Sequence, residues 1–182
     1  MLHLLGTHYE YAYRYPAPFN HFSEADETGN QQKERRVRAE YDNAVLYNDY
    51  IVDEIIRRFE DRNAILIYVS DHAENVYDER DTEAGHDEIN ANRYMAEIPM
   101  IVWMSAPFRA AYPDLEQRIA LSTNRPFMTD DMIHVLLDIM GIETKEYDPT
   151  KSVINEQFDA NRVRIYGKNN DYEKERRGIK TK

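Results

Sequence analysis

Cysteine is absent from all 182 residues, so the chain can form neither disulfide bonds nor thiolate metal sites. Its absence does not indicate a compartment, because cysteine-free proteins occur in all of them. Long hydrophobic runs are also lacking: the longest, residues 64–69 and 98–104, fall far short of the roughly 20 residues that cross a bilayer. Because residues 1–8 have neither a basic start nor a long apolar stretch, the sequence predicts no transmembrane helix and no secretory signal. We therefore expect the chain as printed to be soluble.

Basic residues are outnumbered by acidic ones. The 23 Lys and Arg against 34 Asp and Glu give a formal net charge of −11, which argues against a protein that binds the phosphate backbone of nucleic acids. The exception is segment 161–182, whose eight basic and three acidic residues give +5 and leave −16 on the rest of the chain. We interpret residues 166–182 as a charged, flexible tail, with contact to an anionic lipid surface as the alternative.

Helical and strand patterns alternate along the chain, and its hydrophobic content of 42% is enough for a core. Residues 64–70 and 98–104 are apolar runs without polar alternation, a pattern typical of strands buried on both faces. Residues 37–59 and 129–140 show helical spacing, and Gly141 is a typical stop for the second helix. This layout predicts an α/β fold with a mostly parallel sheet, in which the two strands are neighbours and the two helices cover its faces.

Asp71, His72 and Glu74 follow the first predicted strand directly. Ligand sites of α/β proteins lie beyond the carboxyl ends of their strands. In that position Asp71 offers an oxygen and His72 a nitrogen, a mixed set of ligands suited to zinc or a similar divalent metal. The alternative is that the strand leaves the core through ordinary polar turn residues, since Asp-His pairs are common.

Two further histidines lie near predicted strand ends. His8 follows a leucine-rich run that includes His3, and their five-residue separation predicts that His8 lies in the turn after a strand. His86 follows Gly85, whose conformational freedom permits a tight turn that directs the ring back toward the site. Each ring taken singly could be an ordinary exposed or hydrogen-bonded histidine. Their common position favours one shared site.

Six segments occur in a highly specific order and spacing: Leu4–His8, Tyr41–Asp49, Ile67–Glu74, Gly85–His86, Ile98–Trp103 and Arg125–Asp131. Together they resemble the membrane-bound phosphoethanolamine transferases that modify bacterial lipopolysaccharide. These enzymes belong to the sulfatase branch of the alkaline phosphatase superfamily. The resemblance, which extends from about His3 to Arg164, implies an alkaline phosphatase-like (sulfatase) α/β sandwich with a mostly parallel central sheet, present here as a C-terminal portion.

The resemblance also implies roles for individual residues. Asp71 and His72 would be metal ligands for one or two zinc ions, or for another divalent metal. His8 and His86 would be catalytic and substrate-binding residues, which contact the transferred phosphate or a second metal and stabilise transition-state charge or move a proton. Glu74 is either a partner that orients a ligand or a solvated loop carboxylate.

The chain departs from the family pattern in two ways. In the family, an acidic metal ligand and the nucleophilic threonine precede the segment that matches His3, after an N-terminal membrane domain. No threonine of this chain occupies that context, so we expect residues 1–165 to be a partial catalytic domain that needs these upstream segments and is inactive alone. Ala73 stands where the family usually has glycine, and a positive φ there would strain the turn by roughly 1 kcal/mol.

The function implied by the resemblance is metal-dependent transfer of phosphoethanolamine from phosphatidylethanolamine to lipid A or a core sugar of lipopolysaccharide, at the periplasmic face of the inner membrane. Two other classes stay open at this point. A sulfatase or phosphatase would share the fold and the metal, with a different nucleophile upstream. A non-catalytic module would bind metal weakly or not at all and serve a partner protein instead. Metal content and activity separate these classes.

Overall fold

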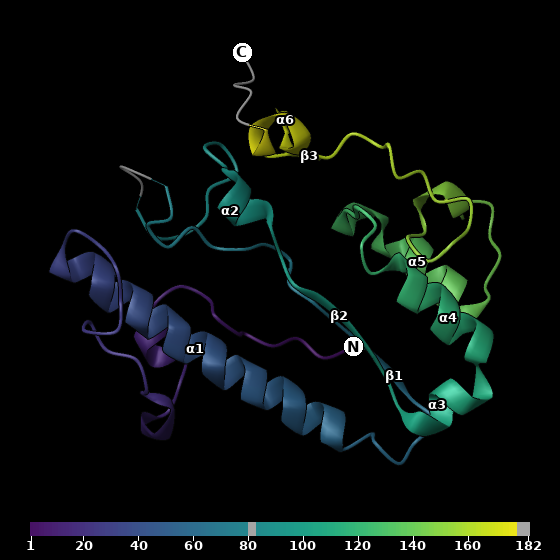
Figure 1. The fold of residues 1–182 in the computed structure, drawn as a ribbon, viewed down its shortest axis with the longest axis horizontal. Coiled ribbons are helices and arrows are strands. Elements are labelled where there is room, and N and C mark those ends of the chain that lie inside the picture. Colours follow the sequence, from purple (N-terminus) through teal and green to yellow (C-terminus); the bar gives the residue numbers. More distant parts are fainter. Residues whose placement is uncertain (80–82, 178–182) are drawn as a thin grey trace. The chain divides into compact units, whose positions relative to one another are not determined.

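The computed structural model describes residues 1–79 and 83–177. The chain divides into two compact units and passes between them three times (Figure 1). The first unit comprises Met1–Arg58 and His72–Ile98, and the second comprises Phe59–Asp71 and Pro99–Lys182. In the described residues, no helix is both long and apolar enough to cross a membrane.

The first unit is built along α1 (Gln32–Arg57), which begins five residues before the predicted start of the helix. The earlier start follows from a capping box, in which the Gln31 side chain accepts from the backbone of Glu34 and the Glu34 side chain accepts from the backbone of Gln31. The 3₁₀ turns η1 (Tyr11–Tyr13) and η2 (Ala17–Phe19) pack against this helix (Figure 1). The short helix α2 (Arg93–Ala96) completes the unit.

Asn43 of α1 holds the segment between η2 and the helix in place. Its buried side-chain oxygen accepts hydrogen bonds from the backbone N–H groups of His21 and Phe22, at 2.7 and 2.8 Å. Its amide nitrogen donates to the side-chain oxygen of Asn20 and to the carbonyl of Phe22. Both polar atoms of this buried amide therefore have hydrogen-bond partners, as burial requires.

The second unit contains β1 (Ile65–Val69) and β2 (Met100–Met104), which pair in a two-stranded sheet with Ile67 opposite Val102. The prediction that these strands are neighbours is confirmed. Within the mostly parallel sheet that was predicted, this pair is antiparallel, because Val69 at the end of β1 pairs with Met100 at the start of β2. The chain leaves and re-enters the sheet at the same end, which needs no crossover and gives an antiparallel pair.

One face of this sheet is covered by α4 (Pro113–Ser122) and α5 (Met132–Met140). The buried core of the unit is aliphatic and consists of Ile119, Val135, Val153 and Ile154, with Ile65, Val102 and Met104 of the strands packed against it. The predicted packing of the C-terminal helix on the sheet is thereby confirmed. The predicted packing of residues 37–59 on the same sheet stays a prediction, because α1 belongs to the other unit.

The ends of α5 show how local chemistry sets a helix boundary. Gly141 ends it in the left-handed conformation, with φ of 63°, as the sequence predicted. At the other end, the predicted helical start at Thr129 forms the 3₁₀ turn η3 (Thr129–Asp131), and the α-helix begins at Met132. Tightening of the first turn into a 3₁₀ helix is common at helix ends.

The C-terminal region forms small elements of its own. Strands β3 (Ile165–Tyr166) and β4 (Asn170–Asp171) pair as an antiparallel hairpin, and α6 (Tyr172–Arg176) follows. The hairpin spans the predicted boundary between residues 165 and 166. The division into a domain of residues 1–165 and a flexible tail of residues 166–182 stays a prediction, and its last five residues lie outside the described part of the chain.

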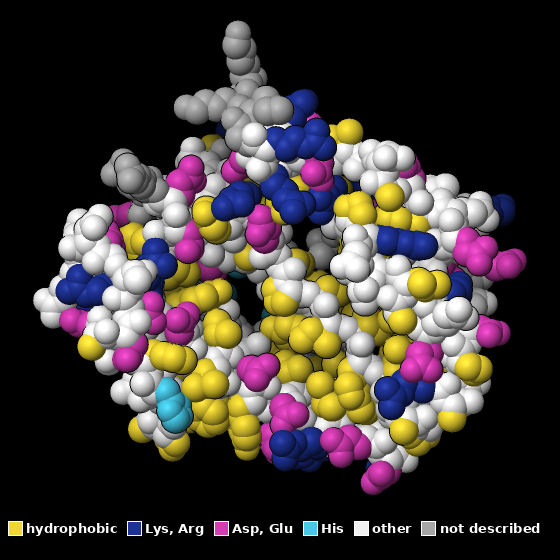
Figure 2. Space-filling view, viewed as in Figure 1, with side chains coloured by type: hydrophobic (Ala, Val, Ile, Leu, Met, Phe, Trp, Pro, Cys, Tyr) yellow, Lys and Arg dark blue, Asp and Glu magenta, His cyan; other side chains and the backbone are white. Residues whose placement is uncertain are grey.

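The strand pair of the second unit is only partly covered. Every residue of β1 is half-buried, and 43% of Ile101 in β2 is exposed. Figure 2 shows hydrophobic side chains gathered over the part of the molecule where β1 and β2 lie. Apolar runs without polar alternation therefore predicted the strands correctly, but burial on both faces was not found in this chain.

Candidate metal centre

The segment from His72 to His86 is closed into a loop by a short backbone ladder. Asn75 and Gly85 form an antiparallel bridge, in which the N–H of each donates to the carbonyl of the other, at 3.0 and 2.9 Å. The fully buried side chain of Asn75 adds a hydrogen bond to the carbonyl of Glu83. Gly85 has a φ of 132°, a conformation that side-chain-bearing residues rarely adopt.

This bridge brings Glu74 and His86 together, because residues one step out from a bridged antiparallel pair lie opposite each other on the same face. His86 Nδ1 lies 2.9 Å from Glu74 Oε1. His72 Nδ1 lies 4.0 Å from the same oxygen, and the centroids of the two imidazole rings are 3.7 Å apart. His86 therefore lies beside His72 and Glu74.

His72, Glu74 and His86 form a group that can hold a metal ion. Each offers one ligand atom, and these atoms all lie within 4.8 Å of one another. The Glu74 side chain is 5% exposed, whereas those of His72 and His86 are 36% and 40% exposed, so the carboxylate lies beneath two accessible rings. The alternative that Glu74 is a solvated loop carboxylate is wrong.

The hydrogen-bond partners assign the tautomer of each neutral ring. His86 Nδ1 faces a carboxylate oxygen, and His72 Nδ1 lies 3.1 Å from the carbonyl oxygen of Ala73. Both oxygens can only accept, so Nδ1 carries the hydrogen in both rings and the lone pair resides on Nε2. Histidines that ligate metals are commonly held in this way, with the other ring nitrogen donating to a carboxylate or backbone carbonyl.

Tyr11 of η1 completes the group from a distant part of the chain. Its hydroxyl donates to Glu74 Oε2 at 3.0 Å, and the residue is only 3% exposed. Burial, together with the neighbouring negative charge of Glu74, raises the pKa of the Tyr11 phenol above its ordinary value, so the hydroxyl stays a donor. Burial and the same carboxylate also raise the pKa of Tyr41, whose ring lies edge-on to that of Tyr11.

The structure brings together only some of the residues predicted from the sequence. His72 and His86 lie in the group, whereas Asp71 and His8 are exposed and are not members of it. Their roles as metal ligand and catalytic residue stay predictions. The opening residues 1–8 form no strand; instead, Gly6 has a φ of 52° and His8 N–H donates to the carbonyl of Leu5. His8 is therefore in a turn, as predicted, but without a strand before it.

Ala73 introduces no strain. Among the described residues, positive φ angles outside glycine occur at Glu10, Tyr77 and Asn169, and Ala73 is not one of them. The condition for strain, a positive φ at this position, is therefore not met. The Ala73 N–H donates to the carbonyl of Met95, which ties the loop to α2.

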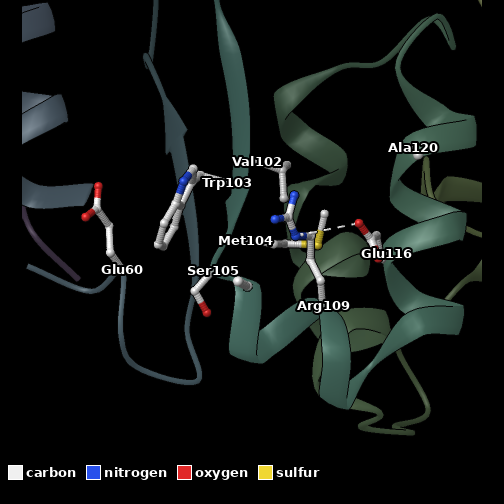
Figure 3. Close-up of a pocket in the computed structure, with 9 residues that line it drawn as sticks. Glu60, Val102, Trp103, Met104, Ser105, Arg109, Glu116 and Ala120 are labelled. Carbon is white, nitrogen blue, oxygen red and sulfur yellow. Dashed lines mark ion pairs between the residues drawn. The ribbon is translucent and has the colours of Figure 1, made fainter. Parts of the chain in front are cut away.

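A pocket in the second unit offers less chemistry. It has a volume of about 440 Å³ and lies beside β2, with Trp103, Met104 and Ser105 in its lining (Figure 3). Its charged side chains include Arg109 and Glu116, which pair with each other at 3.7 Å. These charges are neutralised mutually, and the lining contains no histidine, so the loop at His72–His86 is the better candidate site.

Comparison with known proteins identifies the class. Residues 1–142 match the Sulfatase family, and the chain belongs to that family. The alkaline phosphatase-like (sulfatase) fold is therefore confirmed, although the sheets in the described residues are small and antiparallel.

The particular relatives are phosphoethanolamine transferases, as the six segments predicted. The chain is 39% identical over 165 residues to "Phosphoethanolamine transferase EptC" of Escherichia coli, a match that covers 87% of this chain and 28% of that protein. Among solved structures it resembles the C-terminal periplasmic domain of the E. coli EptC, with a TM-score of 0.83, 36% identity, and coverage of 94% of this chain and 51% of that one. The same domain in complex with Zn gives a TM-score of 0.80, with 35% identity and coverage of 92% and 49%. The chain thus spans about half of the solved domain and just over a quarter of the curated relative.

Proposed function

We propose that this chain supplies a metal-holding part of an enzyme that transfers phosphoethanolamine to lipopolysaccharide. The observation that carries the proposal is the group formed by His72, Glu74 and His86, because it lies in the stretch that matches the Sulfatase family and one similar solved domain was obtained with zinc. The named activity of the relatives supports the transfer of phosphoethanolamine rather than the removal of sulfate.

The donor set fits zinc. Two imidazoles and a carboxylate are ligands that zinc takes in proteins, and the cysteine-free chain offers no thiolate to compete with them. When bound in such a site, zinc stabilises negative charge on phosphoryl oxygens and promotes ionisation of a hydroxyl nucleophile. His72 and His86 hold the ion together with Asp71, and Glu74 orients His86. His8 contacts the transferred phosphate and neutralises charge that develops during transfer.

The substrates are taken from the family resemblance. Phosphatidylethanolamine is the donor and a phosphate of lipid A or of a core sugar is the acceptor, so the chain acts at the periplasmic face of the inner membrane. The exposure of both imidazole rings supports this assignment, since a lipid headgroup can reach them without opening the loop.

Zinc titration calorimetry tests the metal assignment. The chain and the variants His72→Ala and His86→Ala are compared, with His3→Ala as the matched control because His3 is exposed and lies outside the group. We expect each site variant to bind zinc about tenfold more weakly or worse, and the control to bind as the parent does. Equal affinity in all four proteins, or no binding to any, would remove zinc from the proposed function.

The 182-residue chain alone is expected not to form a phospho-enzyme. None of its threonines occupies the family's nucleophile context, and losing a nucleophile lowers rates by orders of magnitude, about 10⁶ in subtilisin. Incubation with a labelled phosphatidylethanolamine analogue, followed by intact mass measurement, checks this. A stoichiometric adduct on any threonine would show that the chain carries a complete site. A parent chain that binds no zinc and forms no adduct would favour a non-catalytic module.

A further inference from the structure

Tyr11 is held more tightly than a surface aromatic would be. The residue is almost fully buried, its ring packs edge-on against Tyr41 with centroids 5.1 Å apart, and its carbonyl accepts the N–H of Arg14 at 2.9 Å. Tyr41 belongs to α1, so the ring is seated against the longest helix of the chain. The hydroxyl consequently has little freedom in where it points.

The single polar group of this rigid side chain points to Glu74. The two carboxylate oxygens have separate partners: Oε2 accepts from the Tyr11 hydroxyl and Oε1 accepts from His86 Nδ1. The terminal torsion of a glutamate is broad and nearly two-fold, so a carboxylate held at one oxygen only can swing. Anchoring Oε2 from the side of η1 therefore fixes where Oε1 lies, and with it the ring of His86.

We propose that Tyr11 is a positioning residue of the metal centre, acting through Glu74 to hold His86 with its hydrogen on Nδ1 and its lone pair on Nε2. In this arrangement Glu74 orients the ring, in the manner of the carboxylate–histidine–metal triads, and the metal or the phosphate meets His86 at Nε2. The metal-binding part of this inference rests on the proposed function, whereas the orientation of His86 does not depend on any metal.

If the Tyr11 hydroxyl had a purely structural role, its removal would lower the stability of the protein and leave the tautomer of His86 unchanged. The proposal requires more, because loss of the hydroxyl should release the carboxylate and let the His86 ring sample both tautomers. Long-range ¹H–¹⁵N correlation spectra of histidine rings report the tautomer directly. They are recorded on the metal-free chain at about pH 8.5, where unperturbed imidazoles are neutral, with His86→Asn to assign the signal.

Tyr11→Phe is the decisive variant, and Tyr13→Phe is the matched control because Tyr13 lies in the same 3₁₀ turn but is 81% exposed. In the parent and the control we expect the Nδ1–H tautomer of His86, and in Tyr11→Phe a mixture. Zinc titration of the same proteins should show about tenfold weaker binding for Tyr11→Phe alone, the scale seen when an outer partner of a metal ligand is removed.

Glu74→Gln tests the same chain of contacts should Tyr11→Phe not fold. With the amide oxygen taken by the Tyr11 hydroxyl, the amide nitrogen faces His86 Nδ1 and donates to it, which reverses the tautomer to Nε2–H. A His86 ring that stays Nδ1–H in both Tyr11→Phe and Glu74→Gln would overturn the proposal. The expected tautomers in a chain that binds no zinc would support the positioning of His86 while removing the metal from the proposed function.

Discussion

The interiors of the two units differ in their apolar packing, although both units bury polar side chains. The second unit has an aliphatic core, formed by Ile119, Val135, Val153 and Ile154 between the helices and the strand pair. The first unit buries Asn43, Glu74, Asn75 and Asn92 alongside Tyr11 and a few small apolar side chains, and three of these amides or carboxylates organise loops. The candidate metal centre lies in the first unit. Polar groups that must be hydrogen-bonded in one geometry give the directional control that ligands of a metal require, which apolar packing does not provide.

The largest expected effect lies in the aliphatic core. Ile154→Ala should lower the free energy of unfolding by about 3 kcal/mol, because it removes buried methylene groups and leaves a cavity among Ile119, Val135 and Val153. Urea denaturation followed by circular dichroism measures the change, and Val163→Ala, at a position that is 56% exposed, is the control. A loss below about 1 kcal/mol would mean that this core is not the main source of stability of the second unit.

Removal of a buried polar side chain in the first unit should lower the stability almost as much. Asn43→Ala leaves the N–H groups of His21 and Phe22 without their acceptor inside the protein, so we expect a loss of about 2 kcal/mol. The exposed Asn30 is the control position, where alanine should change little. If Asn43→Ala proved neutral in denaturation, the contrast between a polar and an aliphatic unit would fail.

Substitution of two glycines distinguishes an effect on the metal centre from an effect on stability. Gly85→Ala and Gly141→Ala both place a side chain at positive φ, which costs roughly 1–2 kcal/mol, and in neither case does the new Cβ meet another atom closer than about 4 Å. Of the two, only Gly85 belongs to the bridge that sets Glu74 opposite His86. We expect similar losses of stability, with weaker zinc binding for Gly85→Ala alone. Equal zinc affinity in both variants would contradict the role of the bridge.

A smaller effect, which depends on pH, is expected at Asp138. This residue accepts hydrogen bonds from a group of polar side chains in the second unit. Burial alone would raise its pKa, but hydrogen bonds from Ser152, Arg118 and Asn155 outweigh burial and hold the pKa below its ordinary value. A depressed folded-state pKa gives stability that is present above the unfolded pKa, about 3.9, and is lost as the pH falls through the folded pKa. Asp138→Asn should therefore be less stable than the parent at neutral pH, and this difference should shrink in acid. Denaturation at pH values from about 6 to 2.5 checks this, and a constant difference would contradict it.

Much of the second unit could be predicted because apolar pattern and burial are linked there. The runs at 64–70 and 98–104 became β1 and β2, and Gly141 ended α5. Strand direction could not be predicted in the same way, since an apolar run reports burial and carries no information on whether the chain crosses the sheet or turns back. The sequence likewise singled out His72, Glu74 and His86, but not Tyr11.

Tyr11 illustrates what sequence patterns miss in the first unit. It lies 63 positions before Glu74, in a stretch with tyrosines on both sides, and nothing in the spacing distinguishes it from Tyr9 or Tyr13. Only the seating of η1 against α1 decides which of the three hydroxyls is buried. The signal that could have pointed to it is Glu74 itself, because a buried carboxylate must find hydrogen-bond donors, and a tyrosine hydroxyl is one of them.

X-ray absorption at the zinc edge tests the metal centre most directly, because it reports which atoms surround the ion. With one equivalent of zinc bound to the chain, we expect scattering from two imidazoles with nitrogens about 2.0 Å from the metal, and from one imidazole in His86→Ala. His3→Ala should reproduce the spectrum of the parent. A parent spectrum without imidazole scattering, or one that His86→Ala leaves unchanged, would show that zinc does not bind at His72 and His86.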